Sequence, residues 1–289
     1  MSQPIIKQVK QICQAYDITP NRSKGQNFLI SQKVLEQIAA CANLSTDDEI
    51  LEVGPGLGIL TELLVKRAKR VISVELDKKL FTFLQLKFSE VKNLELINDD
   101  ILKFQPKSLK LSALSYKIVA NLPYNITSIF LKKFLTDEFR PKEMTLLVQK
   151  EVAQRICASP GQMSLLAISI QLYASPKIIS IVDKSNFWPS PEVNSAVIKI
   201  ENIKSSKEVD NYLKGITEQF FWRIVKIGFS SKRKQLQNNL AAGLKISNDQ
   251  VKKVLKKANF DPQIRAQNLS ITDWITLAQN LSSDSDYLG

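Results

Sequence analysis

Several short segments of this 289-residue sequence combine residue types that could hold a nucleoside or act on an amine. The first is Glu52–Gly58 (EVGPGLG), which follows an apolar run and precedes a helical pattern. Glycines at such a turn let a ligand approach the backbone without a Cβ clash, and open α/β sheets bind ligands beside it. A tight turn between a strand and a helix, with no ligand, is the alternative interpretation.

The spacing of these glycines argues against a dinucleotide. The dinucleotide fingerprint G-x-G-x-x-G is met at Gly54 and Gly56, but its third position is Ile59. The third glycine comes one residue early, at Gly58. The loop therefore favours a ligand that has no pyrophosphate.

Acidic residues end the next two apolar runs. Glu75 could accept hydrogen bonds from both hydroxyls of a ribose, although a solvated strand end or an ion pair with Lys78 is the alternative. Asp100 could accept the amino group of adenine, whereas we expect Asp99 to form an Asx-type turn. Together with the glycine loop, these acids predict a ligand that contains adenosine.

The residues expected to carry the chemistry are in Asn121–Asn125 (NLPYN), at the end of a fourth apolar run. The side-chain oxygen of Asn121 and the carbonyl of Leu122 could both accept from one exocyclic amine. Pro123 fixes φ and so keeps that carbonyl aimed, and Tyr124 offers a face on which a base can stack. Positioning of the amine would supply most of the catalysis without a general base. A plain turn before a helix, capped by an asparagine or threonine, is the alternative.

A second aromatic block, Asn186–Val197 (NFWPSPEVNSAV), is stiffened by two prolines. We expect Phe187 to cover the opposite face of a flipped-out base. We expect Trp188 to cap the hydrophobic core. In the alternative interpretation, both Phe187 and Trp188 cap the core and neither contacts a base.

Composition excludes several other classes of site. Histidine is absent, which removes histidine triads, histidine metal ligands and histidine bases. The three cysteines, Cys13, Cys41 and Cys157, form no C-x-x-C pair, so neither structural zinc nor a disulfide framework is expected, and no metal is predicted. The sequence also has no apolar run long enough to span a membrane. Its first residues predict an amphipathic helix, not a signal peptide, and we expect a cytoplasmic protein.

Strand and helix patterns alternate over about 150 residues and predict a parallel sheet covered by helices on both faces. Strands are expected at residues 49–53, 70–76, 94–98, 116–121, 143–149, 165–173 and 195–201. After Ser205 only helical patterns remain. We therefore expect two domains, 1–204 and 205–289, with the boundary near Ile203–Ser206.

Taken together, these motifs make the chain resemble the ribosomal RNA adenine N6-dimethyltransferases, and in particular those that act on the bacterial small subunit. The resemblance rests on five segments and runs from about residue 24 to residue 240. They are Gly25–Leu29 (GQNFL), Glu52–Gly58, Asn121–Ile126 (NLPYNI), Phe187–Val197 and Gly228–Leu240 (GFSSKRKQLQNNL).

The resemblance implies an α/β fold, a Rossmann-like class I sheet that uses S-adenosylmethionine, followed by a small all-α domain. It implies contacts to the methyl donor from Asn27, Leu29, Gly54, Gly56, Glu75, Asp100 and Asn121. It also implies two successive methylations of each of two adjacent adenosines in a 3'-terminal hairpin of small-subunit rRNA, and a role in the biogenesis of that subunit.

The charge distribution fits a polyanionic partner. The whole chain carries a net charge of +12, and residues 213–257 hold 11 Lys and Arg against 2 Asp and Glu. We interpret Lys232, Arg233 and Lys234 as contacts to RNA phosphates, with Arg22 and Lys24 extending the same basic field. A merely solvated helical face is the alternative. The expected partner is rRNA in the immature 30S subunit, bound by a monomer, with no membrane partner.

Two other functions stay open at this stage. A large-subunit rRNA methyltransferase would use the same chemistry, although the Phe229–Lys234 segment and the larger C-terminal domain argue against it. The second is a non-catalytic nucleic-acid-binding protein built on the same fold. The presence of residues suited to bind a methyl donor and an amine argues against it, because such a protein would not need them.

Overall fold

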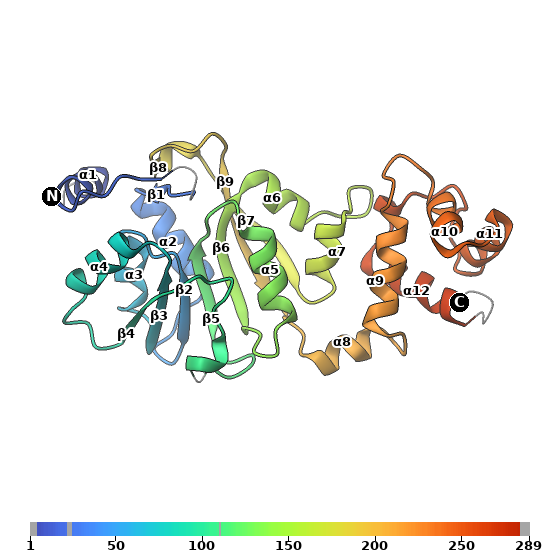
Figure 1. Cartoon of the computed structure of the whole chain (residues 1–289), viewed down its shortest axis with the longest axis horizontal. Helices are drawn as coiled ribbons and strands as arrows, with labels where there is room; N and C mark the ends of the chain where they lie inside the picture. The colour runs from blue at the N-terminus through green and yellow to red at the C-terminus, as the bar shows by residue number, and fades with distance from the viewer. Residues whose placement is uncertain (1–4, 22–24, 110, 284–289) are drawn as a thin grey trace. The chain divides into compact units, whose positions relative to one another are not determined.

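A computed structural model of the chain describes residues 5–21, 25–109 and 111–283. The chain forms two compact units, which we call the N-terminal and the C-terminal unit (Figure 1). The N-terminal unit comprises Met1–Gln154 and Ala174–Ile203, and the C-terminal unit comprises Arg155–Tyr173 and Lys204–Gly289. The sequence predicts a single boundary after residue 204, which would include Arg155–Tyr173 in the first domain. The structure groups that segment with the helices that follow residue 204.

The N-terminal unit is built on a sheet of seven strands in the described part of the chain, in the order β4-β3-β2-β5-β6-β9-β7. The first five in this order are parallel, whereas β9 is antiparallel to both β6 and β7. The expected parallel sheet is therefore a mixed one. The bounds are β2 Glu49–Val53, β3 Arg70–Glu75, β4 Leu94–Asn98, β5 Lys117–Asn121, β6 Glu143–Gln149, β7 Ser175–Val182 and β9 Ser195–Glu201.

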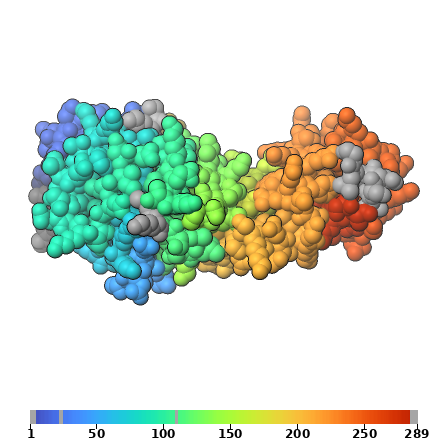
Figure 2. Space-filling view, turned by 60° about the horizontal axis from the view of Figure 1, so that its bottom comes forward, coloured from blue at the N-terminus to red at the C-terminus, as the bar shows by residue number. Residues whose placement is uncertain are grey.

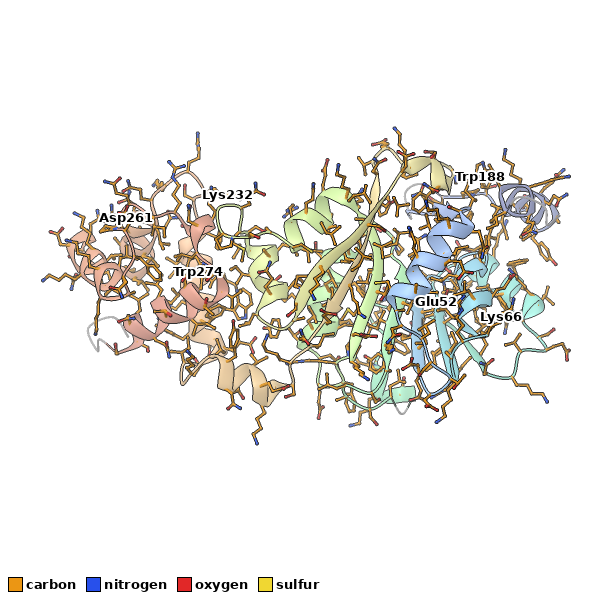
Figure 3. The ribbon with its side chains drawn as sticks, turned by 180° about the vertical axis from the view of Figure 1, so that it is seen from behind. Glu52, Lys66, Trp188, Lys232, Asp261 and Trp274 are labelled. Atoms are coloured by element: carbon orange, nitrogen blue, oxygen red, sulfur yellow. The ribbon has the colours of Figure 1, made fainter. Side chains whose placement is uncertain are left out.

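Apolar strands in the middle of this sheet are covered on both faces, as their continuous apolar runs predict. The helices are α1 Ile5–Ala15, α2 Gln32–Cys41, α3 Ile59–Leu64, α4 Lys78–Lys87, α5 Thr127–Thr136 and α6 Lys150–Ile156. One core cluster joins Leu35 and Ile38 of α2 to Val119 and Leu147 of the sheet. Figures 1 and 3 show α2 and α5 on opposite faces of the sheet.

One expected strand is wrong. Residues 165–173 form helix α7 (Leu165–Gln171), and the edge strand is instead β7, which begins at Ser175. The side chain of Ser164 accepts a hydrogen bond from the Ala167 amide (3.2 Å) and so caps α7. Its buried residues, Ala167, Ile168 and Ile170, follow the helical period.

The helix N-caps differ in their hydrogen bonds. Asp77 caps α4, because its side chain accepts from the amides of Lys79 and Leu80. Ser31 occupies the N-cap position of α2 but makes no side-chain hydrogen bond there. The N-cap position of α5 is Ile126, so that helix has no side-chain cap from an asparagine or threonine.

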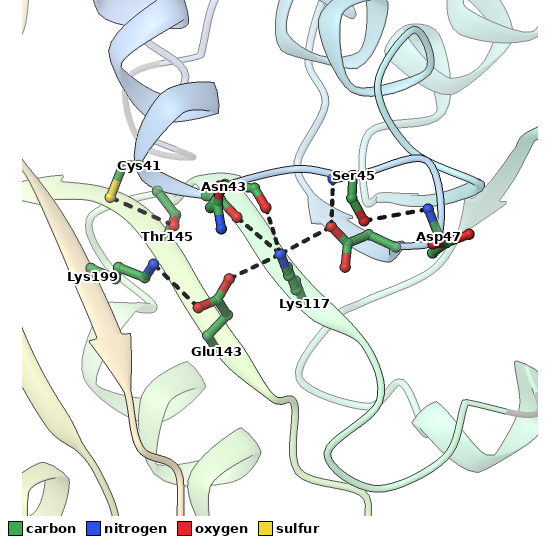
Figure 4. A network of polar contacts seen from close by, with 10 residues as sticks. Cys41, Asn43, Ser45, Asp47, Lys117, Glu143, Thr145 and Lys199 are labelled. Atoms are coloured by element: carbon green, nitrogen blue, oxygen red, sulfur yellow. Dashed lines mark hydrogen bonds and ion pairs between the residues drawn. The ribbon is translucent and has the colours of Figure 1, made fainter.

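A polar network closes the amino end of the sheet, away from the carboxyl ends of the strands (Figure 4). Lys117, the first residue of β5, lies 2.9 Å from Asp48 and 3.2 Å from Glu143. It also donates to the backbone carbonyls of Ala42 and Asn43, just after α2. A buried ammonium needs such partners, and here they fix the end of α2 against the first residues of β5 and β6.

The C-terminal unit is helical. The helical pattern that follows residue 205 begins with two helices, because the chain turns at Gly215, where φ is +92°, and a new helix starts at the Thr217 cap. Besides α7, the helices are α8 Ser206–Tyr212, α9 Glu218–Gly228, α10 Leu236–Leu244, α11 Asn248–Lys257 and α12 Ile271–Ser282. In Figure 2 the atoms of the residues that follow residue 204, coloured orange to red, lie together in one body.

Trp274 of α12 lies inside this body, with no exposed surface (Figure 3). A Cβ atom on Gly228 would lie 2.3 Å from its ring, so only glycine fits at this crossing of α9 and α12. Across the described residues, no helix is long and apolar enough to cross a membrane.

Candidate methyl-donor cleft and amine site

A cleft lies at the carboxyl ends of β2, β3, β4 and β5, where an open α/β sheet places its ligands. It holds about 1260 Å³ of empty space, part of it open to solvent. The donor residues implied by the resemblance all line this cleft: Asn27, Leu29, Gly54, Gly56, Glu75, Asp100 and Asn121. Because β3, β2 and β5 are neighbours, the strand ends bring together residues that are far apart in the sequence.

The glycine loop forms one wall. Gly54, Gly56 and Gly58 all have left-handed backbones, with φ between +59° and +72°. A Cβ atom on Gly58 would lie 2.5 Å from the Phe88 ring. From the same turn as Phe88, the Lys87 ammonium donates to the Leu57 carbonyl at 2.8 Å. The end of α4 therefore holds the loop in place from behind.

Glu75 lies at the end of β3 and is 6% exposed. Its carboxylate accepts hydrogen bonds from the Gly56 amide (3.1 Å) and the Asp77 amide (2.9 Å), so it is tied to the glycine loop. Burial raises the pKa of the Glu75 carboxyl, and the two amide hydrogen bonds oppose that rise. Each oxygen can still accept from a ligand hydroxyl, since a carboxylate oxygen has two lone pairs.

Glu52 is a residue of β2, just before the glycine loop (Figure 3), and no individual role is predicted for it from the sequence. Its Oε2 accepts from Thr61 (2.8 Å) and Ser73 (2.5 Å). Its Oε1 is buried and has no hydrogen-bond partner among the described residues. Burial raises the pKa of Glu52 to about 7. An acid inside an otherwise apolar strand was the signal that could have identified it.

Asp99 and Asp100 both line the cleft, but Asp99 does not form the expected Asx-type turn. Asp99 accepts from the neighbouring amide of Asp100 at 2.7 Å. The Asx-type hydrogen bond, two residues along, belongs to Asp100, whose Oδ1 accepts from the Leu102 amide at 2.9 Å. No donor from the described residues is seen at the second oxygen of Asp100, so this atom can accept from a ligand.

At the end of β5, the Asn121 side chain is oriented by its own hydrogen bond. Its Nδ2 donates to the Asn27 carbonyl at 3.2 Å, so Oδ1 is the atom left to accept from an amine. Leu122 is 1% exposed, its amide donates to the Leu147 carbonyl, and its own carbonyl accepts from none of the described residues. Pro123 lines the cleft. Two acceptors at the end of one strand fit the predicted capture of a single amino group.

The aromatic residues are arranged differently from the expectation. Tyr124 is half-buried, and its hydroxyl lies 2.7 Å from that of Ser195. Phe187 is 3% exposed and belongs to the core cluster, while Trp188 is half-buried, so Phe187 is the more deeply packed of the two. Both lie in β8 (Phe187–Trp188), which pairs with β1 (Phe28–Leu29).

In the C-terminal unit, Lys232, Arg233 and Lys234 are exposed in the loop between α9 and α10 (Lys232 in Figure 3). The buried Asn239 stabilises this loop, because its Nδ2 donates to the carbonyls of Gly228 (2.6 Å) and Ser231 (3.0 Å). Arg22 and Lys24, the other predicted RNA contacts, lie outside the described residues.

Comparisons with known proteins identify the family of the chain. Residues 18–283 match the profile of a family described as ribosomal RNA adenine dimethylase. The chain is 42% identical, over 93% of its length and 91% of the relative's, to the ribosomal RNA small subunit methyltransferase A of Dehalococcoides mccartyi. It is 38% identical to the protein of that name in Alkaliphilus oremlandii, over 96% of each chain.

Two solved structures share the fold. A dimethyladenosine transferase from Plasmodium falciparum aligns with a TM-score of 0.75 and 24% identity, over 89% of this chain and 98% of that one. The 23S rRNA methyltransferase ErmE aligns with a TM-score of 0.69 and 27% identity, over 89% of this chain and all of that one.

Proposed function

The chain belongs to the ribosomal RNA adenine dimethylase family, and we propose that it methylates N6 of two adjacent adenosines in a 3'-terminal hairpin of small-subunit rRNA. The observation that carries this proposal is the Asn121 side chain, which keeps an acceptor oxygen beside the donor cleft at the end of β5. The two relatives described above that are named for the small subunit are 42% and 38% identical to the chain, whereas the large-subunit enzyme ErmE is 27% identical. This difference favours the small subunit as the substrate.

S-adenosylmethionine is the methyl donor that the fold and the family indicate, and when bound it supplies an electrophilic methyl group. The cleft suits such a ligand because left-handed glycines let the backbone approach it and Glu75 offers carboxylate oxygens to a ribose. Asp100 would accept from the adenine amino group, and Asn27 and Leu29 would close the side of the cleft formed by β1.

On the acceptor side, Asn121 and Leu122 would take both hydrogens of the N6 amino group in hydrogen bonds. This arrangement favours a nitrogen whose lone pair is directed away from the protein acceptors and toward the donor. Pro123 keeps the Leu122 carbonyl fixed, and Tyr124 would stack on the base. Most of the rate enhancement would come from this positioning. The role of Phe187 as a second stacking surface stays a proposal, because the ring would have to leave its packed position.

We place RNA phosphates against the exposed loop of Lys232, Arg233 and Lys234, with the C-terminal helices as the RNA-binding domain. The substrate would be rRNA in the immature 30S subunit, which the chain would bind as a monomer in the cytoplasm. The methylation would then form part of small-subunit biogenesis.

The experiment that tests this function uses labelled S-adenosylmethionine with immature small subunits, and large subunits as the control substrate. We expect label in N6,N6-dimethyladenosine at two adjacent positions of the small-subunit rRNA. Label confined to the large-subunit rRNA would favour the large-subunit function instead. Binding to RNA without any transfer of label would indicate a non-catalytic protein.

A further inference from the structure

Ser195 contacts the predicted acceptor site although no role has been assigned to it. Its Oγ lies 2.7 Å from the hydroxyl of Tyr124, and the residue has no exposed surface. Tyr124 follows β5 and Ser195 is the first residue of β9, so the hydrogen bond joins two segments 71 residues apart in the sequence.

We propose that Ser195 is a positioning residue for methyl transfer, whose hydroxyl holds the Tyr124 ring at the angle needed to stack on the target adenine. This inference rests on the proposed function, because it takes adenine as the acceptor. Ser195 would touch neither the donor nor the base, and would act only through Tyr124.

The backbone of Ser195 is a rigid anchor. Because β9 runs antiparallel to β6, its first residue lies at the carboxyl end of β6, where Ser195 pairs with Gln149. On its other side Ser195 pairs with Val182 of β7. The next residue back, Asn194, accepts from the Lys150 amide at 2.9 Å. A serine has a single side-chain torsion with three staggered positions, so fixing its backbone leaves few places for the hydroxyl.

Tyr124, by contrast, needs an anchor. It lies in the turn between β5 and α5, and its side chain is half-buried beside the exposed Asn125. Ser195 is the partner of its hydroxyl among the described residues. Burial raises the pKa of the Tyr124 phenol, with the Ser195 hydrogen bond opposing the rise, so the group stays protonated and can hold this bond at neutral pH.

The segment Phe187–Ser195 would thus support both sides of the amine site. At one end, β8 pairs with β1, and the Asn27 carbonyl just before β1 holds the Asn121 amide. At the other end, Ser195 holds Tyr124. This gives the aromatic block a supporting role that does not require Phe187 to leave the core.

The test is a double-mutant cycle on single-turnover methylation of immature small subunits, with Ser195→Ala, Tyr124→Phe and the double variant. Each single change removes the same hydrogen bond. We expect each to slow methyl transfer about 5- to 20-fold, and the double variant to be no slower than the slower single variant. Affinities for S-adenosylmethionine and for the RNA should stay within about twofold, because neither ligand touches Ser195.

Ser180→Ala is the matched control. Ser180 is a serine of the adjacent strand β7 whose buried hydroxyl has no hydrogen-bond partner among the described residues. We expect this variant to methylate at the wild-type rate. Tyr124→Phe changes a half-buried side chain, so it still tests the contact if Ser195→Ala folds poorly.

Three results would overturn the inference. One is wild-type transfer in Ser195→Ala or in Tyr124→Phe, and another is single losses that multiply in the double variant. Loss of donor affinity in step with the rate would also overturn it, since Ser195 would then have a general structural role. These outcomes differ from failure of the proposed function, in which the unaltered chain itself transfers no label to small-subunit adenines.

Discussion

Single residues of the cleft show why its chemistry depends on burial. Glu52 and Glu75 are both carboxyl groups that line one cleft, yet their hydrogen-bond partners differ. Glu75 accepts from two backbone amides, whereas Glu52 accepts from two hydroxyls on one oxygen and leaves the other oxygen without a partner among the described residues. The charged form of Glu52 is therefore the less well compensated of the two.

This difference predicts a pH dependence of stability. Burial raises the pKa of Glu52 from 4.5 to about 7, so the folded chain binds this proton more tightly than the unfolded chain does. The resulting stabilisation is fully present below pH 4.5 and is lost as the pH rises to about 7. Between pH 5 and pH 8 we expect the free energy of unfolding to fall by about 3 kcal/mol more in the wild type than in Glu52→Gln.

Denaturant unfolding of the donor-free protein at several pH values measures this difference. Glu90→Gln is the control, because Glu90 is exposed after α4 and its substitution should leave the wild-type pH profile unchanged. If the free energy of unfolding changed with pH in the same way in the wild type and in Glu52→Gln, Glu52 would be ionised in the folded chain throughout this pH range, and the prediction would be wrong.

Much of this site was predictable from residue types. The glycine loop, Glu75, Asp100 and Asn121 were each identified from their position after an apolar run, and they meet in one cleft because the strands that precede them are neighbours. The Tyr124–Ser195 contact was not predictable. It depends on the antiparallel direction of β9, which no local sequence pattern records.

At the scale of elements, the glycine loop is held by the end of α4. Gly58 needs a left-handed backbone, with φ of +72°, and a Cβ atom there would also collide with Phe88 and Leu84. Gly215 allows the effect of backbone strain to be measured without the collision. Its backbone is also left-handed, with φ of +92°, but a Cβ atom added there would have no other atom within 4 Å.

We therefore expect Gly58→Ala to lower the free energy of unfolding by about 2–4 kcal/mol, from backbone strain and overpacking together. Gly215→Ala should cost about 1–2 kcal/mol, from backbone strain alone. Denaturant unfolding of the two variants gives both values, and calorimetric titration with S-adenosylmethionine should show weaker binding only for Gly58→Ala. Equal losses of stability would mean that Phe88 does not constrain the loop.

The elements that sequence reasoning misassigned lie where tertiary contacts decide the structure. Residues 165–173 (LLAISIQLY) are apolar enough for a buried strand, yet Ser164 caps them into a helix that packs within the C-terminal unit. The true edge strand β7 was missed because its sequence lacks a clean alternating pattern and contains a register shift between Ile178 and Ser180. A short apolar run does not distinguish these two outcomes.

At the scale of the whole molecule, charge is distributed unevenly along the chain. Residues 213–257 carry 11 basic and 2 acidic side chains, within a chain whose net charge is +12. Contacts between such side chains and phosphates release condensed counterions from RNA, so the affinity should fall steeply as salt increases.

We predict that the triple change Lys232→Ala, Arg233→Ala and Lys234→Ala makes the dependence of RNA affinity on salt less steep. The slope of log affinity against log salt concentration should become less negative by about 2–3, because three phosphate contacts are lost. Filter binding of the small-subunit hairpin across a salt series measures the slope. A triple change at the exposed lysines Lys7, Lys10 and Lys78 of α1 and α4 is the charge-matched control. Equal slopes for the two triple variants would place the RNA elsewhere.

We propose that Asn121 presents the adenine amino group to the methyl donor. The most direct test is single-turnover methyl transfer by Asn121→Ala, with donor and RNA affinities measured on the same protein. We predict a loss of transfer of at least about 100-fold at saturating donor, with the RNA affinity within about threefold of wild type. Wild-type transfer by this variant would contradict the account.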